Sequence, residues 1–131
     1  MNTRGQSAIE FMIIVGVVFF LFIAFLGVLQ SQRADQIYAD RDVAAKEVAL
    51  TVQDEVNLAQ SSRDGYQRTF VLPYELLGLP YTVNASLGFV FVRTIDERHA
   101  LALPIANVSG QITTGSNTIR KKNGTISLNV P

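Results

Sequence analysis

The chain has 131 residues, enough for one domain and an additional segment, and 48% of them are hydrophobic. Eleven basic side chains balance eleven acidic ones, so no excess of charge favours nucleic acid as a partner. With no cysteine and the single histidine His99, the chain can form neither a disulfide framework nor a thiolate or multi-histidine metal site. Composition therefore argues against a DNA-binding protein, and we expect no nucleic-acid partner and no cofactor.

An apolar run of 19 residues, from Phe11 to Leu29, contains no charged side chain. At about 1.5 Å per residue, a helix of this length spans roughly 28 Å, close to the thickness of the hydrocarbon layer of a membrane. A secretory signal peptide would have a shorter apolar core followed by small residues at a cleavage site, whereas this run is followed by Gln30 and Ser31. The simplest interpretation is a signal anchor that stays on the protein, with Arg4 in the cytoplasm.

One carboxylate, Glu10, directly precedes this apolar run. Burying an unpaired carboxylate in lipid is costly, so a partner or a position at the membrane surface must offset the cost. A plain anchor gives Glu10 no role. The nearest candidate partner is an N-terminal amine.

Glu10 belongs to a short motif in which Arg4-Gly5 is followed by Gln6-Ser7-Ala8-Ile9-Glu10-Phe11. This motif resembles the class III signal peptide of archaeal type IV pilin-like proteins, in which a membrane peptidase cuts after the glycine. The resemblance implies that residues 1–5 are a leader peptide, that Gly5 and Gln6 flank the processing site, and that Glu10 is the fifth residue of the mature chain. It also implies that the apolar helix is first a membrane anchor and later the packing core of a filament.

Two related groups share parts of this motif. Bacterial TadE-like pseudopilins also have small residues and a glutamate before an apolar run. Archaellins, the filament subunits of the archaeal swimming organelle, share the processing route but usually lack the glutamate, so Glu10 favours a pilus. We further hypothesise that Glu10 pairs with the new amine of Gln6, on its own chain or on a neighbour.

The helix is expected to continue beyond the apolar run to about Ser61, because after Leu29 no glycine occurs until Gly65 and no proline until Pro73. Apolar residues recur every three or four positions in this part and give one stripe on an otherwise polar helix. The stripe consists of Ile37, Ala44, Ala45, Val48, Val52, Val56 and Ala59. A helix over residues 11–61 would be about 75 Å long, so a small domain can cover only part of it.

Short β-branched or aromatic runs separated by Pro, Gly, Asn or Asp follow Gly65 and predict strands. The predicted strands are 66–72, 81–87, 89–95, 100–105, 111–114 and 125–130, and Asn123-Gly124 predicts a type I′ hairpin near the end of the chain. We therefore expect an α+β fold in which a long N-terminal α-helix, residues 6–64, precedes a small antiparallel β-rich head, residues 65–131. The resemblance implies the lollipop layout of pilins for these parts.

Catalytic motifs such as Gly-x-Ser-x-Gly, a phosphate-binding loop or metal-ligand spacing do not occur in the sequence. His99 lies close to Asp96 and Glu97, but neighbouring residues on a turn usually point apart, so the three are interpreted as a solvent-exposed turn. Arg120-Lys121-Lys122 is interpreted as a solvated basic patch. We expect no catalytic residues and no enzyme.

Three Asn-x-Ser/Thr sequons begin at Asn84, Asn107 and Asn123, all beyond the apolar run. Such triplets arise often by chance in a Ser/Thr-rich β domain, and Asn123 also has its role in the turn. The resemblance implies that such sites carry N-linked glycans, above all at Asn107.

The function that the resemblance implies is structural: a pilin of an archaeal type IV-like pilus that polymerises through its apolar helix and serves surface adhesion. Its partners would be copies of itself, a prepilin peptidase, and an assembly ATPase with its membrane platform. The subunit would lie in the cell membrane with a cytoplasmic N-terminus before assembly, and in an extracellular filament afterwards. Two alternatives are a membrane-anchored surface domain that binds a partner and never polymerises, and a minor pseudopilin.

Overall fold

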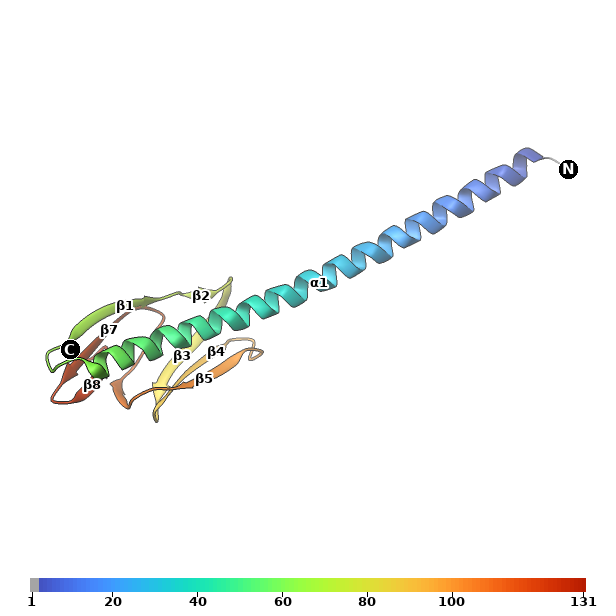
Figure 1. Cartoon of the computed structure of the whole chain (residues 1–131). Coiled ribbons are helices and arrows are strands. Elements are labelled where there is room, and N and C mark those ends of the chain that lie inside the picture. The colour runs from blue at the N-terminus through green and yellow to red at the C-terminus, as the bar shows by residue number, and fades with distance from the viewer. Residues whose placement is uncertain (1–2) are drawn as a thin grey trace. The chain divides into compact units, whose positions relative to one another are not determined.

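The computed structural model describes residues 3–131, with side chains from Gln6 onward, so Met1 and Asn2 of the predicted leader lie outside the described residues. Within 3–131 the helix α1 (Thr3–Ser61) is followed by eight strands (Figure 1). They are β1 (Gln67–Leu72), β2 (Glu75–Leu76), β3 (Leu79–Ser86), β4 (Phe89–Thr94), β5 (Ala100–Pro104), β6 (Val108–Gly110), β7 (Gly115–Lys122) and β8 (Thr125–Leu128). The predicted α+β class, a long helix before antiparallel-rich sheets, is confirmed.

The chain divides into two compact units, Met1–Tyr38 and Ala39–Pro131, and α1 contributes to both. In the first unit the helix exposes every described side chain from Gln6 to Tyr38. The second unit contains the rest of α1 and all of the strands. Ile37, the first residue of the predicted stripe, lies in the first unit and is 48% exposed, so it is not part of the buried portion of the stripe.

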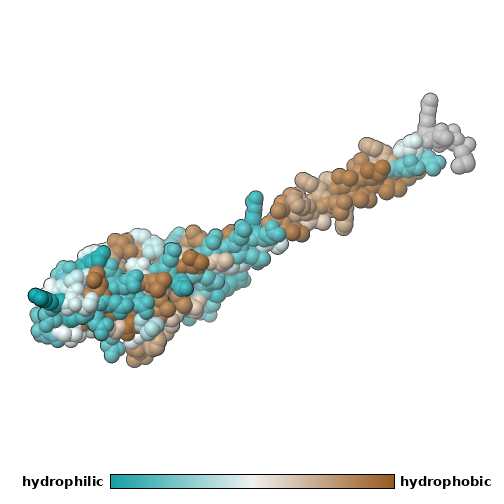
Figure 2. Space-filling view, in the orientation of Figure 1, coloured by the Kyte–Doolittle hydropathy of each residue, from teal (hydrophilic) through white to brown (hydrophobic). Residues whose placement is uncertain are grey.

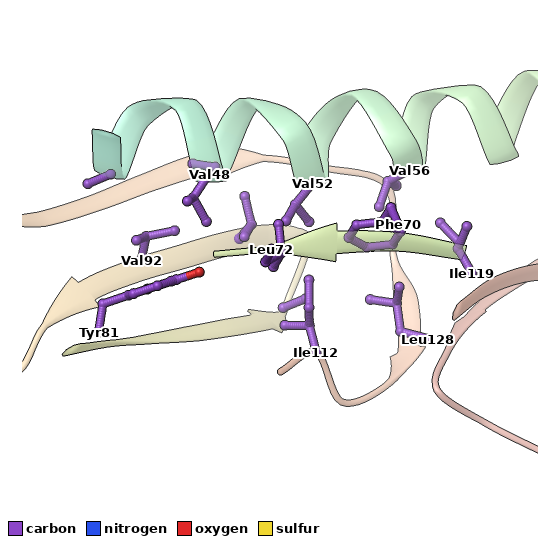
Figure 3. Packing of buried hydrophobic residues seen from close by; sticks show 14 of the residues in the cluster. Val48, Val52, Val56, Phe70, Leu72, Tyr81, Val92, Ile112, Ile119 and Leu128 are labelled. Carbon is purple, nitrogen blue, oxygen red and sulfur yellow. The ribbon is translucent and has the colours of Figure 1, made fainter. Parts of the chain in front are cut away.

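One face of α1 is buried in the second unit and carries small or β-branched side chains. The buried residues on this face are Ala45, Val48, Ala49, Val52, Val56 and Ala59. Their spacing confirms the predicted stripe over this part of the helix, which also includes Ala49. Figure 3 shows Val48, Val52 and Val56 pointing from α1 toward the buried side chains of the strands.

Two four-stranded sheets complete the second unit, with strand orders β1-β7-β8-β6 and β2-β3-β4-β5. Neighbouring strands are antiparallel, except that β6 runs parallel to β8. Both sheets contribute to the same apolar cluster as α1, through buried residues such as Phe70, Leu72, Tyr81, Val92, Ile119 and Leu128 (Figure 3). The core therefore joins one helix face to two sheets.

The terminal hairpin forms as predicted, with β7 and β8 joined by Asn123 at φ 51° and Gly124 at φ 75°. Both values lie in the left-handed region that a type I′ turn requires. The predicted strand 111–114 is wrong. The strand in this region is β6, which ends at Gly110, and the short β2 was not predicted.

The buried side chain of Asn117 explains why 111–114 is not a strand. Its amide group binds both backbone groups of Thr113: the Thr113 N–H donates to Oδ1 at 2.9 Å, and Nδ2 donates to the Thr113 carbonyl at 2.7 Å. Nδ2 also donates to the Gly115 carbonyl at 3.1 Å, and Oδ1 accepts from Asn129 Nδ2 at 2.8 Å. A side chain therefore supplies hydrogen bonds that a neighbouring strand would supply in a ladder.

The end of α1 is attached to the β7–β8 hairpin. Lys121 Nζ donates to the carbonyls of Gln60 at 2.6 Å and Ser62 at 2.8 Å, which satisfies carbonyls at the helix end. Asp64 Oδ1 accepts from the Gly124 N–H at 2.9 Å. The interpretation of 120–122 as a merely solvated patch is therefore wrong for Lys121.

The turn between β4 and β5 places His99 differently from the prediction. His99 is only 6% exposed, and its Nδ1 makes a hydrogen bond with Asp42 of α1. The Thr94 N–H donates to the His99 carbonyl at 2.9 Å, so the loop closes and the ring is held against the helix. The prediction of a solvent-exposed turn is wrong for His99, because the sequence does not reveal that α1 supplies a partner.

Asp96 stabilises the same turn. The Thr94 hydroxyl donates to its carboxylate at 2.5 Å, and the Arg98 N–H donates to it at 3.2 Å. These bonds, the Thr94 hydroxyl first, hold the pKa of Asp96 below its usual value. Asp96 therefore acts in the structure of the turn.

Candidate functional site

The processing motif lies at the start of α1. Arg4 and Gly5 have helical backbone, and their side-chain surroundings lie outside the described residues. Gln6 Nε2 donates to Glu10 Oε1 at 3.4 Å, across four residues of the helix. Residues 6 and 10 therefore occupy the same face of the helix, one turn apart.

The apolar run that follows Glu10 in the sequence is exposed. Its large hydrophobic side chains range from 38% exposed at Leu29 to 72% exposed at Met12, and Figure 2 shows them in brown along this part of α1. By length and composition this helix could cross a membrane. A continuous apolar surface of this extent requires lipid or protein to cover it.

The three sequon asparagines are all exposed. Asn84 lies on β3, directly opposite Phe91 of β4, and Asn107 lies between β5 and β6. Asn123 forms the turn of the terminal hairpin. Each side chain is open to modification, and the three lie on different elements of the second unit.

A groove in the second unit carries two carboxylates that the sequence does not bring together. We call it the acidic groove, and it is lined by Ala44, Glu47, Val48, Thr51, Val71, Leu72, Pro73, Glu75, Leu76 and Leu77. Glu47 belongs to α1 and Glu75 to β2. Only the packing of α1 against the strand region could reveal this pairing, because Glu75 lies 28 positions after Glu47 in the sequence (75 − 47).

A second surface carries the basic residues 120–122. We call it the basic end, and it is lined by Gly65, Tyr66, Gln67, Arg120, Lys121 and Lys122. The basic run was visible in the sequence. The sequence does not show that the residues at the start of β1 lie beside this basic run, because that placement depends on the pairing of β1 with β7.

Within residues 3–131, no group of three or more His, Asp or Glu side chains is arranged to hold a metal ion. His99 and Asp42 are joined by a hydrogen bond, and the ring is buried against α1. That pair stabilises the packing of the β4–β5 turn. The expectations of no enzyme and no cofactor stay predictions.

No protein-family model, no curated protein and no solved structure matches this chain. The long apolar helix followed by a β-sheet unit is consistent with a pilin-like fold.

Proposed function

We propose that this chain is the structural subunit of an archaeal type IV-like pilus, which polymerises through its apolar helix and serves surface adhesion. The observation that carries the proposal is the exposed apolar run that begins directly after Glu10. The buried core of the described residues runs from Ala45 to Leu128, so the cover of the apolar run has to come from lipid or from other chains.

In this proposal the subunit first lies in the cell membrane, with its N-terminus in the cytoplasm. A prepilin peptidase cuts between Gly5 and Gln6, and an assembly ATPase with a membrane platform moves the mature chain into an extracellular filament. The side chains of residues 11–29 exchange contacts with lipid for contacts with neighbouring copies, so they remain buried at every stage.

Processing and polymerisation are tested together by N-terminal sequencing of material sheared from cells. The expected sequence begins at Gln6, and Gly5→Val abolishes both cleavage and filaments. Thr3→Val, which keeps the Arg4-Gly5 pair, is the control and leaves assembly intact. A non-polymerising anchored protein would keep its leader, stay with the cells and be indifferent to Gly5→Val.

Glu10 is proposed to pair with the new amine of Gln6, on its own chain or a neighbour. The contact between the two side chains supports this role, because it places residues 6 and 10 on one helix face. Glu10→Gln keeps the size of the side chain and removes its charge, so we expect markedly fewer filaments per cell by electron microscopy. Asp35→Asn is the control on the same helix, and normal filament numbers for Glu10→Gln would refute the role.

The sequons are proposed to carry N-linked glycans. Exposure of all three asparagines supports access by a glycosyltransferase, and Phe91 opposite Asn84 offers an apolar surface on which a sugar ring can lie. The intact mass of the sheared subunit measures this directly. A mass equal to that of the unmodified chain from residue 6 to residue 131 would end the proposal.

A further inference from the structure

The acidic groove and the basic end have opposite charge. The groove is lined by Glu47 and Glu75 and by no basic residue, whereas the basic end is lined by Arg120, Lys121 and Lys122 and by no acidic residue. Both surfaces belong to the second unit, so their separation is a property of one compact body. One chain therefore carries both halves of a complementary pair.

The two surfaces lie at opposite ends of the same strand. Gln67, the first residue of β1, lines the basic end, and Val71 and Leu72, at its last positions, line the acidic groove. At about 3.3 Å per residue, the ends of β1 are roughly 17 Å apart. The surfaces cannot satisfy each other within one chain, because strand β1 separates them.

The free charge of each surface comes from particular residues. Lys121 donates to the carbonyls of Gln60 and Ser62, and Arg120 Nη1 donates to the Val130 carbonyl at 3.2 Å, so the exposed Lys122 supplies the most accessible charge of the basic end. Both glutamates of the groove are exposed. Val71 and Leu77 at the groove are 67% and 58% exposed, so a partner seated there would also bury apolar surface.

We infer that the second units of neighbouring copies contact one another head to tail, with the basic end of one copy seated in the acidic groove of the next. Such a contact uses two different surfaces and does not close on itself, so it repeats along an open array. The inference rests on the proposed function, which supplies the filament in which copies are held close together.

The contact is expected to be weak, which is sufficient for copies that are already held together by their apolar helices. Exposed ion pairs are worth about 0 to 1 kcal/mol each, too little to join free monomers. Copies already held by their apolar helices meet at a high effective concentration, where a weak contact is occupied. The contact would therefore set which neighbour each head touches, while the apolar helices supply the cohesion.

Charge reversal tests the contact in the full chain expressed in cells. Variant A carries Glu47→Lys and Glu75→Lys, and variant B carries Arg120→Glu and Lys122→Glu. Each variant alone should form about tenfold fewer filaments than the wild type, since like charges then meet at every contact. Co-expression of A with B should restore filaments, because the two ends of each contact again differ in sign.

Two matched controls, Asp54→Lys and Lys46→Glu, reverse exposed charges of α1 outside both surfaces and should assemble like the wild type. If A and B alone assemble like the wild type, or if co-expression restores nothing, the head-to-tail contact is overturned while the pilus proposal stands. If the wild type itself forms no filament, both are overturned.

Cross-linking gives a second measurement that does not depend on charge-reversed variants. The native chain has no cysteine, so Glu75→Cys with Lys122→Cys introduces one thiol on each surface. A thiol cross-linker applied to filaments should give a ladder of dimers, trimers and larger species, whereas Lys46→Cys with Lys122→Cys should give none. Absence of a ladder for the first pair would overturn the contact.

Discussion

Tyr81 introduces a hydroxyl group into the apolar cluster between α1 and the sheets. The side chain is buried, and its hydroxyl donates to the Pro73 carbonyl at 2.5 Å. Burial raises the pKa of Tyr81 to about 12, because the charged phenolate would lose its hydration. The free energy of unfolding is therefore expected to depend on pH in the alkaline range.

Stability should fall as the pH rises from about 10 to about 12. In this range the unfolded chain releases the Tyr81 proton at its ordinary pKa while the folded chain keeps it, so each step in pH favours unfolding. The total loss is about 2 to 3 kcal/mol. Urea unfolding of the full chain in detergent, followed by circular dichroism in steps across this range, measures the slope.

Tyr81→Phe should flatten this slope and cost about 1 kcal/mol at pH 7, since it removes the titrating group and one hydrogen bond. Tyr74→Phe is the control, because Tyr74 is exposed. An unchanged alkaline slope in Tyr81→Phe would assign the pH dependence to another group.

At the scale of elements, the junction of α1 with the β7–β8 hairpin depends on Lys121. Its ammonium group binds two carbonyls at the helix end, where a positive charge is also favoured by the helix dipole. Lys121→Met keeps the aliphatic part of the side chain and removes both bonds. We expect a loss of about 1 to 2 kcal/mol in the free energy of unfolding, because the bonds are charge-assisted and partly exposed.

Hydrogen exchange of the last turn of α1 measures this effect locally. Lys121→Met should speed exchange of the Ser62 amide, which donates to the Leu58 carbonyl at 3.1 Å, relative to amides in the middle of the helix. Lys122→Met, at the exposed neighbouring position, should leave it unchanged. Equal effects of the two variants would refute the capping role.

The elements with a clear period in sequence were predictable, and those that depend on distant partners were not. The helix stripe at Val48, Val52 and Val56 follows the period of a helix, and Asn123-Gly124 encodes its own turn. The segment after Gly110 looked like a strand because its side chains suit one, but Asn117, several residues away, binds its backbone instead.

The same distinction holds for the candidate sites. Glu10 and its apolar run are contiguous, so sequence alone locates them. The acidic groove is lined by both Glu47 of α1 and Glu75 of β2, and no local sequence pattern predicts that these two residues lie near each other. His99 was misplaced for the same reason, since its partner Asp42 lies on α1.

At the scale of the whole molecule, the two units differ in what they bury. The described core lies entirely within Ala39–Pro131, whereas the described side chains of residues 6–38 are exposed. We therefore predict that a protein consisting of residues 39–131 folds without detergent, remains monomeric and unfolds cooperatively. Size-exclusion chromatography and thermal unfolding by circular dichroism measure these properties.

The full chain is the comparison for that experiment. It should need detergent or lipid to stay dispersed, because residues 11–29 expose a continuous apolar surface. If residues 39–131 aggregated or lacked a cooperative transition, the second unit would depend on the first for its folding.

The place of β8 within its sheet has a consequence for the order of folding during synthesis. It lies between β7 and β6, and it contributes Ile126 and Leu128 to the core. Because β8 follows β6 and β7 in the chain, β6 has no hydrogen-bonded partner in this sheet until residues 125–128 have been synthesised. A nascent chain without residues 125–128 would leave one edge of β7 and one edge of β6 unpaired, so the synthesis of β8 determines when this sheet closes.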